Sequence, residues 1–505
     1  MRKNLLALSI AAMIGGVSGM ANAAVFSNDV AAGTLAAPAA GSRATDLVVT
    51  PSGVGHILAV PYFSTQGANA TLLNIINTDT TNGKAVKLRF RGAANSDDIF
   101  DITVFLSPGD MWTANVSASG ELSALTTSDT SCTLPSAADI KAQGGLFKTG
   151  RVNPTNSNAQ TREGYIEILN TADIPPETGA TTLFTAIKHV AGKAPCTASV
   201  MDLQANELVA NDTTHDPKVR GYSWPTGGLA ANWVIVNTAD MASFSGEAVA
   251  VRAENTGANA SGNLVWFPQT SDAPSYATSA DTVKGFTADP LLQSTGFTAL
   301  VANYDFPDLS TPYTTVAAVN ATATADQATK LATALETKQV INEYLVGGAA
   351  NFSTDWVFSA PTRRYAVAVD YAGKKLLDNT LVTRHFTPTN TTLDATSLQA
   401  CVTPGGAMKG FSREEDTQST FVISPDTALK LCGETSVLSF GVTGTTPTKV
   451  LNASIAARNV GVNYAEGWMS IGTTGLGKGL PVIGYAAAKT KGSNLGGTWM
   501  HRTSK

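Results

Sequence analysis

Hydrophobic and polar residues alternate along several stretches of this chain. In residues 86–91, Val, Leu and Phe alternate with Lys and Arg, and the apolar positions of residues 100–106 recur at the same spacing. A period of two is typical of a β-strand with one face in the core. Residues 72–76 are more continuously apolar, as in a central strand, and turn-forming residues at 79–83 and 107–110 separate these segments. This arrangement predicts an antiparallel β-sandwich.

The same pattern returns later in the chain. Residues 233–236 and 247–251 are further strand candidates, and residues 365–371 alternate again. Residues 326–345 are rich in Ala and Lys, and their apolar side chains fall near one face at helical spacing. They predict one helix, which ends before a Gly-Gly pair.

These elements predict a mainly β fold, with two antiparallel β-sandwich regions and a few helices. We expect an N-terminal β-sandwich region over residues 47–270 and a C-terminal β-rich region over residues 271–505. Residues 24–46 are rich in Ala, Gly and Ser, and we expect them to be a linker or a loosely held arm.

The first residues have the three-part layout of a secretory signal peptide. Arg2 and Lys3 precede an apolar run over residues 5–17, and small residues then lead to an expected cleavage between Ala23 and Ala24. The alternative is a permanent membrane anchor, but the run is short for a membrane span. We therefore expect an exported protein without a transmembrane segment in its mature chain.

The composition limits the kinds of molecule that the protein is expected to bind. Hydrophobic residues make up 43% of the 505 residues and charged residues only 14%, and the net charge is −5. Charged residues are about 25% of a typical globular protein. A folded chain of this charge is a poor nucleic-acid partner, because such proteins carry a basic surface.

An even number of cysteines in an exported chain predicts disulfides. Four cysteines allow three pairings, and we favour the nearest-neighbour one, in which each bridge stays within one region. Free buried thiols are the alternative. The favoured pairs are Cys132 with Cys196, in an irregular stretch over residues 122–217, and Cys401 with Cys432.

Several groups of residues are candidates for chemistry, each with a plainer interpretation. Residues 472–479 match a phosphate-binding loop up to Lys478, but the next position is Gly479 where Ser or Thr should bind magnesium. We interpret this stretch as a turn. The acidic run 414–416 is expected to be a solvated loop. The histidines lack metalloprotease spacing, and we expect structural or surface roles for His56, His189, His215, His385 and His501.

The best candidate for a calcium site is a cluster of oxygen donors near the start of a strand, namely Asn95, Asp97, Asp98 and Asp101. No EF-hand pattern accompanies it, so calcium is only an open alternative to the expectation of no cofactor. The nearby stripe of Lys87, Arg89 and Arg91 is expected to be a solvated strand face, with an acidic neighbour in a lattice as the alternative. We expect core positions for Trp112, Trp224, Trp233, Trp356 and Trp468.

Residues 55–112 resemble the leading module of a family of exported proteobacterial proteins. Shorter blocks with the same resemblance lie at residues 162–169, 184–196, 231–253, 354–364 and 479–486. The nearest resemblance is to surface-layer-type proteins of betaproteobacteria, which coat the outer membrane and its tubular extensions. The resemblance implies a structural role and supplies no catalytic residues.

We therefore expect a cell-surface protein, not an enzyme, that associates with itself and contacts the outer membrane or lipopolysaccharide. Three alternatives remain: an adhesin, a periplasmic ligand-binding protein, and a hydrolase whose catalytic residues are dispersed along the sequence.

Overall fold

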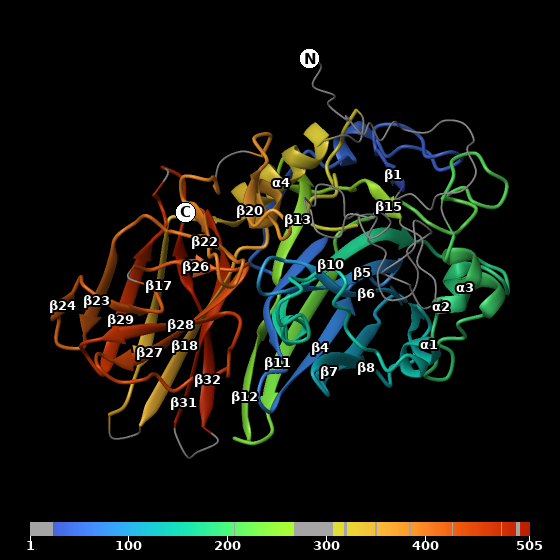
Figure 1. Ribbon diagram of the computed structural model, residues 1–505. Coiled ribbons are helices and arrows are strands. Elements are labelled where there is room, and N and C mark those ends of the chain that lie inside the picture. Colours follow the sequence, from blue (N-terminus) through green and yellow to red (C-terminus); the bar gives the residue numbers. More distant parts are fainter. Residues whose placement is uncertain are drawn as a thin grey trace.

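The computed structural model describes residues 24–206, 208–266, 307–317, 321–348, 351–382, 385–426, 428–475, 477–490 and 495–505. The fold is mainly β, with several antiparallel sheets, as the alternation predicts. Figure 1 shows two β-rich bodies side by side, the N-terminal one blue to green and the C-terminal one orange to red. The predicted signal peptide, including Ala23, lies outside the described residues, which begin at Ala24.

Two sheets form the N-terminal sandwich. The eight-stranded sheet has the order β14 (Ala258–Asn259), β13 (Val249–Asn255), β3 (Ile57–Ser64), β10 (Glu163–Ile174), β5 (Gly83–Gly92), β6 (Asp98–Leu106) and β9 (Cys132–Leu134), with β2 (Asp46–Val49) paired to β13. The five-stranded sheet has the order β12 (Ala242–Glu247), β11 (Leu229–Asn237), β4 (Asn69–Asn77), β7 (Met111–Ser119) and β8 (Leu122–Thr126).

The inner faces of these sheets share one core. Val86, Leu88 and Phe90 of β5 face Trp112 and Trp233 of the smaller sheet, and all five side chains are fully buried. Alternation therefore places every second residue of these strands in a single apolar layer, as the sequence predicts.

The C-terminal sandwich has a six-stranded and a five-stranded sheet. The first has the order β25 (Val422–Ser424), β28 (Ala457–Val462), β27 (Thr435–Val442), β18 (Phe352–Ser359), β31 (Ile483–Thr490) and β32 (Gly496–Met500). The second has the order β24 (Thr417–Gln418), β23 (Met408–Ser412), β29 (Glu466–Gly472), β17 (Gln339–Leu345) and β33 (Arg502–Ser504). Trp356 and Phe440 of the first sheet pack with Tyr344 of the second.

Smaller elements complete the described fold. Short sheets join β1 (Ala24–Phe26) to β15 (Leu264–Trp266), β16 (Glu336–Thr337) to β30 (Leu480–Pro481), β19 (Val367–Asp370) to β20 (Lys375–Asp378), and β21 (Thr391–Leu393) to β22 (Ala400–Val402) and β26 (Leu431–Cys432). The helices are α1 (Ala137–Ala142), α2 (Leu183–Ile187), α3 (Ala198–Gln204), α4 (Ala321–Leu335) and α5 (Arg363–Ala366), with short 3-10 turns at Ala40–Ser42 and Ala159–Thr161. No helix in the described ranges is both long and apolar enough to cross a membrane.

The helix predicted over residues 326–345 is wrong in its second half. The helix ends at Leu335, and residues 339–345 form β17 instead. There, Val340, Asn342 and Tyr344 are buried while the residues between them face outward. The apolar spacing thus changes from a helical period to a period of two within the predicted helix.

Residues 24–46 are not a loosely held arm. Ala24 to Phe26 pair with β15, and Asn28 is buried, with its side chain donating to Ser261 O at 2.7 Å. Ala44 is also buried. The segment is therefore held at a few buried positions, while most of its other residues are partly or fully exposed.

The two sandwiches are in direct contact. Val357, Val437 and Tyr485 of the C-terminal sandwich belong to the same apolar cluster as the N-terminal core. At the rim, Ser245 N of β12 donates to Thr498 Oγ1 of β32 at 3.1 Å, so the edges of two sheets meet. A shared core of this kind couples the two bodies mechanically.

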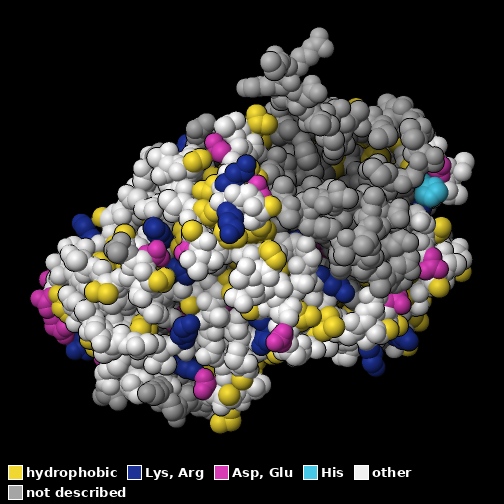
Figure 2. Space-filling view, viewed as in Figure 1, with side chains coloured by type: hydrophobic (Ala, Val, Ile, Leu, Met, Phe, Trp, Pro, Cys, Tyr) yellow, Lys and Arg dark blue, Asp and Glu magenta, His cyan; other side chains and the backbone are white. Residues whose placement is uncertain are grey.

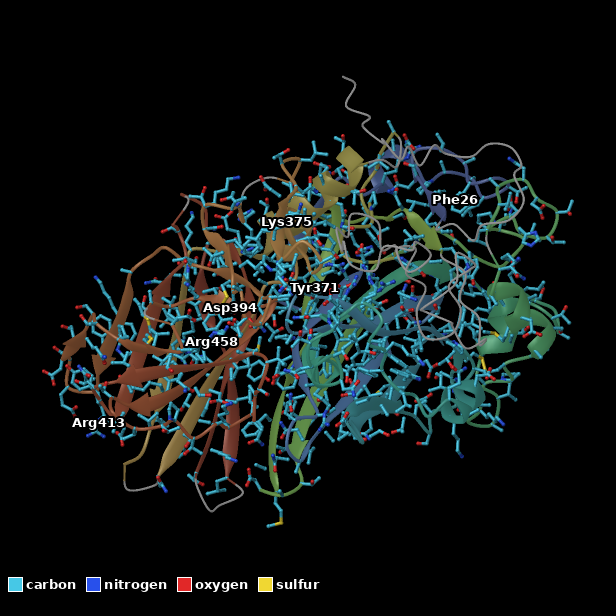
Figure 3. All side chains as sticks on the ribbon, viewed as in Figure 1. Phe26, Tyr371, Lys375, Asp394, Arg413 and Arg458 are labelled. Atoms are coloured by element: carbon cyan, nitrogen blue, oxygen red, sulfur yellow. A yellow bond between two sulfur atoms is a disulfide. The ribbon has the colours of Figure 1, made fainter. Side chains whose placement is uncertain are left out.

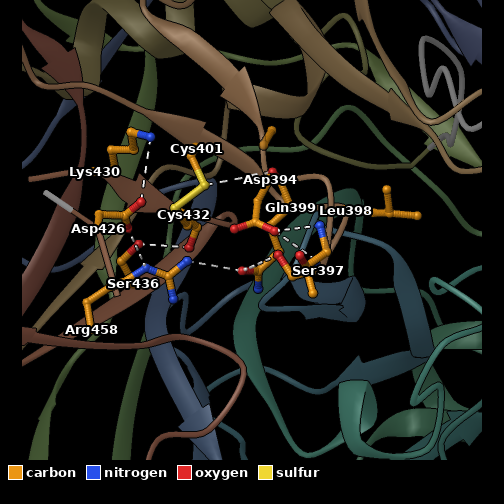
Figure 4. Close-up of a disulfide and its surroundings, with 12 residues drawn as sticks. Asp394, Ser397, Leu398, Gln399, Cys401, Asp426, Lys430, Cys432, Ser436 and Arg458 are labelled. Carbon is orange, nitrogen blue, oxygen red and sulfur yellow. Dashed lines mark hydrogen bonds and ion pairs between the residues drawn. A yellow bond between two sulfur atoms is a disulfide. The ribbon is translucent and has the colours of Figure 1, made fainter. Parts of the chain in front are cut away.

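Two disulfides join Cys132 to Cys196 and Cys401 to Cys432, which is the nearest-neighbour pairing. The second lies between paired residues of β22 and β26, and Figure 4 shows the polar side chains around it. Arg458 there pairs with Asp426 (Nε to Oδ2, 3.5 Å). On the chain-entropy model, loops of this size stabilise the fold by about 4 kcal/mol each.

Candidate functional site

The unusual feature of the molecule is a buried charged layer on the outer face of the eight-stranded sheet. Lys87, Arg89 and Arg91 alternate with the core residues of β5, yet each is at most 2% exposed. The expectation that this stripe is a solvated strand face is therefore wrong. Its neighbours compensate the buried charge, because β6 and β10 flank β5 on both sides and carry carboxylates on the same face.

The charged side chains of the layer pair one step along the sheet. Lys87 Nζ contacts Asp101 Oδ1, and Arg89 Nη1 lies 3.3 Å from Asp98 Oδ2. Arg91 Nε lies 3.2 Å from Glu167 Oε1 on β10. Buried ions need such partners, because an unpaired charge inside a protein is strongly unfavourable.

The proposed calcium ligands serve this layer instead. Asp98 and Asp101 pair with cations, Asp97 accepts a hydrogen bond from Tyr371 Oη, and Asn95 Nδ2 donates to Leu398 O at 2.8 Å. Among the described residues, no group of three or more His, Cys, Asp and Glu side chains is placed to hold a metal ion. The oxygen atoms of this cluster thus bind other side chains and the backbone of the same chain.

Residues from the C-terminal half complete the layer. Arg91 Nη2 lies 3.4 Å from Asp308 Oδ2, and Tyr365 Oη donates to the same carboxylate oxygen at 2.9 Å. Arg363 pairs with Glu434, and both are fully buried. Figure 3 places Tyr371 at the boundary between the two bodies. The layer therefore joins residues that are far apart in the sequence.

Burial shifts the titration of these groups. It lowers the pKa of Lys87 to about 8 and raises the pKa of Asp97 to about 6. Burial also raises the pKa of Glu167 and of Glu434, while the neighbouring arginines oppose the shift. In each case loss of water, more than the partner, sets the direction.

A second anchor lies at Glu163, at the start of β10. Its Oε1 accepts hydrogen bonds from the backbone N–H groups of Ser454, Ile455 and Ala456, at 3.0 Å for Ser454 and 3.3 Å for Ala456. Tyr62 Oη donates to Oε2 at 2.7 Å. A turn of the C-terminal half thus wraps a buried carboxylate of the N-terminal sandwich, as backbone nests wrap anions.

A third buried carboxylate supports the core contact between the bodies. Asp355 of β18 accepts hydrogen bonds from the backbone N–H groups of Val450 at 2.9 Å and Leu451 at 2.8 Å. Burial raises the pKa of Asp355 to about 6, and these hydrogen bonds only partly oppose the shift.

Most histidines have structural contacts. His56 Nε2 lies 2.9 Å from Ala260 O, and burial lowers its pKa to about 3. His385 and His501 also contact backbone carbonyls, and burial lowers the pKa of both. His215 contacts a neighbouring carboxylate near the surface.

His189 has the most chemically suggestive surroundings. Thr130 Oγ1 lies 3.2 Å from its Nε2, and Asp110 Oδ2 lies 3.5 Å from its Nδ1. A hydroxyl and a carboxylate on opposite ring nitrogens resemble a triad. However, Thr130 Oγ1 also donates to Gly192 O at 3.2 Å, and Ser107 Oγ shares Nδ1 at 3.4 Å. The arrangement orients the imidazole between two loops and directs the Thr130 proton to a backbone carbonyl.

The remaining candidates form turns and surface pairs. The Gly-rich loop leads into β30, and Gly479 N donates to Glu336 Oε1 at 2.8 Å, so a carboxylate occupies the loop. The acidic run 414–416 is exposed, and Arg413 pairs with Glu414 and Glu466 at its rim.

The five tryptophans expected in the core divide into two groups. Four of these five are buried in the sandwiches or beside them, namely Trp112, Trp224, Trp233 and Trp356. Trp468 is 39% exposed and stacks on Phe411 of the neighbouring strand at 4.1 Å between ring centroids, so the expectation of a core position is wrong for this residue.

Sequence reasoning missed the buried charged residues Glu163, Glu167, Asp308, Asp355, Arg363 and Glu434. The available signal was a charged residue inside an otherwise apolar strand, as in Tyr-Ile-Glu-Ile at Tyr165–Ile168 and Asp-Trp-Val-Phe at Asp355–Phe358.

Comparisons with family models, with curated proteins and with solved structures give no match.

Proposed function

We propose that this protein is a structural subunit of the bacterial cell surface that assembles with copies of itself into a coat. The observation that carries this proposal is the burial of many charged side chains inside the protein. In the described ranges, ten basic and ten acidic side chains are buried, from a chain with 34 Lys and Arg and 39 Asp and Glu. Such residues are almost never buried unless they are paired.

The buried charges balance each other, so the net charge of −5 comes from the rest of the chain. Figure 2 shows the remaining charged side chains scattered over the visible face instead of gathered in one patch. Weak repulsion between subunits favours close packing, because net charge keeps proteins apart in solution.

Other features agree with this role. Two disulfides, together with a described chain that offers no helix able to cross a membrane, are consistent with an exported protein. The buried charged groups are paired within each body, as in Arg91–Glu167 and Arg363–Glu434, and Arg91 also reaches Asp308 of the C-terminal half, which favours a structural over a catalytic role. The resemblance to surface-layer-type proteins supports the same proposal, with the outer membrane or lipopolysaccharide as the underlying surface.

The test is assembly of the purified chain from residue 24 to residue 505, imaged by negative-stain electron microscopy. We expect sheets or tubes with a regular repeat, with or without millimolar calcium. Because few charges would take part, assembly should persist at ~1 M salt, where surface ion pairs are screened. Dispersed monomers at every protein concentration would contradict the proposal and favour an adhesin or a ligand-binding protein.

A further inference from the structure

The outer face of the five-stranded N-terminal sheet differs from an ordinary solvated sheet face. Leu72 of β4 is 43% exposed and Met111 of β7 is 49% exposed. Val234 of β11 lies directly opposite Leu72, and Ile76 lies directly opposite Met111. Antiparallel sheets that face water usually alternate apolar inward with polar outward positions, and here most outward positions of the two strands β4 and β11 are apolar as well. The outward positions of β7 and β12 are mostly neutral polar residues.

Charge is sparse on this face, with Asp129 at its β7 side, where Oδ2 accepts hydrogen bonds from Thr113 N and Oγ1. The outward positions of the five described strands are Ala, Val, Leu, Ile, Met, Ser, Thr and Asn, apart from Glu247 at the end of β12. The matching sheet of the C-terminal sandwich is different. Its outward positions include Glu343, Lys409 and Arg502, and Arg502 lies 3.5 Å from Glu343. The sparse charge therefore belongs to one sheet and not to the fold as a whole.

The size of the face suits a protein partner. Three of the strands have 9 residues and the other two have 6 and 5. At about 4.8 Å between strands and about 3.4 Å per residue they cover roughly 600 Å². Stable interfaces bury about 600–1,000 Å² on each partner. Figure 1 shows these strands side by side, in the order β12, β11, β4, β7 and β8.

We infer that this face binds the same face of a second copy of the chain. In a two-fold contact a patch meets itself, so any charge on it meets its own like charge. A patch with little charge reduces that repulsion. Asn74 and Asn232 also lie opposite one another on the face and supply neutral donors and acceptors. Two sheets packed in this way would align as sandwich sheets do.

This inference rests on the proposed self-association and names one of its contacts. A two-fold pair closes on itself, so a coat needs a further contact elsewhere on each subunit. If the two-fold pair is lost, subunits should still associate through the other contact. They should no longer form a coat, and the chain should stay folded.

The experiment uses Leu72, which lies on the middle strand of the five, so that two copies of it approach one another across the symmetry axis. We would compare wild type with Leu72→Glu and Leu72→Lys by analytical ultracentrifugation, with circular dichroism as the check on folding. Val422→Glu is the matched control, because Val422 is 57% exposed on β25 of the other sandwich. We expect each Leu72 variant to weaken pairing at least tenfold and Val422→Glu to leave it unchanged.

Mixing the two Leu72 variants sharpens the test. Opposite charges at the axis should restore pairing in the mixture relative to either variant alone. If wild type associates and the Leu72 variants associate equally well, the face inference is wrong while the proposed coat stands. If wild type stays monomeric, both are wrong. Binding of monomers to phospholipid vesicles that Leu72→Glu abolishes would assign the face to a membrane surface and overturn the inference.

Discussion

The two outer faces of the N-terminal sandwich reverse the usual distribution of charge. The outer face of β5 carries Lys87, Arg89 and Arg91 and is buried, whereas the outer face of β4 carries Leu72 and Ile76 and is partly exposed. Both strands alternate, and both place their inner residues in the same core. The comparison teaches that a period of two reports the strand, while the neighbouring elements decide which outer face meets water.

The largest effect should come from breaking a pair on the buried side. Arg363→Met removes the ion-pair partner of the buried Glu434 and leaves Arg364 as its neighbouring arginine, and we expect the unfolding free energy to fall by about 3–5 kcal/mol. The exposed counterpart is Arg413→Met, which removes surface pairs that water screens, and it should leave the unfolding free energy nearly unchanged. Urea denaturation measures both.

The double variant Arg363→Met/Glu434→Met tests the reason for this loss. If the cost comes from an uncompensated buried charge, removing both charges should recover much of the stability. A double variant as unstable as Arg363→Met alone would show that packing, and not charge, causes the loss.

A second prediction concerns the pH at which a buried carboxyl group loses its proton. Burial raises the pKa of Asp355 to about 6 in the folded chain, against 3.8 for an ordinary aspartate in water. Between these values the folded state keeps a proton that the unfolded state has lost, so this group's contribution to stability falls as pH rises through that window. Stability from this source is full below about pH 4.

Asp355→Asn should remove that pH dependence. Its amide oxygen can still accept from the backbone of Val450 and Leu451. We expect the variant to gain about 3 kcal/mol on wild type between pH 4 and pH 7, from two pKa units at about 1.4 kcal/mol each. Chemical denaturation at both pH values gives the difference, and parallel curves would contradict the prediction.

The smallest effect belongs to the exposed side. Met111→Lys adds a charge to the outer face of β7, which is already solvated in the single chain. We expect the unfolding free energy of the monomer to change by at most about 0.5 kcal/mol. A loss above about 1 kcal/mol at concentrations too low for association would mean that Met111 is covered within one chain.

The sequence predicted the fold class because the alternation is local and survives any tertiary arrangement. It could not predict the charged layer, since Arg91 meets Asp308 and Asn95 meets Tyr371 only after distant segments pack. The same limit explains the calcium hypothesis. Asp98 and Asp101 are close in sequence, but the cations that neutralise them lie on the next strand.

The helix error has a different origin. Residues 326–345 contain two periods in succession, and a single window averages them into one helix. Only the pairing of β17 with β29 decides that residues 339–345 are extended. Tertiary pairing overrides local preference there, as it often does for short strands.

The grip of the C-terminal turn on Glu163 bears on the order of events during folding. The carboxylate and the N–H groups that hold it are almost 300 residues apart, with a separation of 291 for Ser454. Arg91 and Asp308 are likewise separated by 217 residues in the sequence. Contacts of such long range form slowly, because a large loop must close first. The N-terminal half emerges first from a ribosome or a translocation channel, so its buried carboxylate and cations lack these partners until the last part of the chain arrives. A chain with such long-range contacts reaches its compact native state late. Late folding suits a polypeptide that is exported across a membrane in an unfolded state.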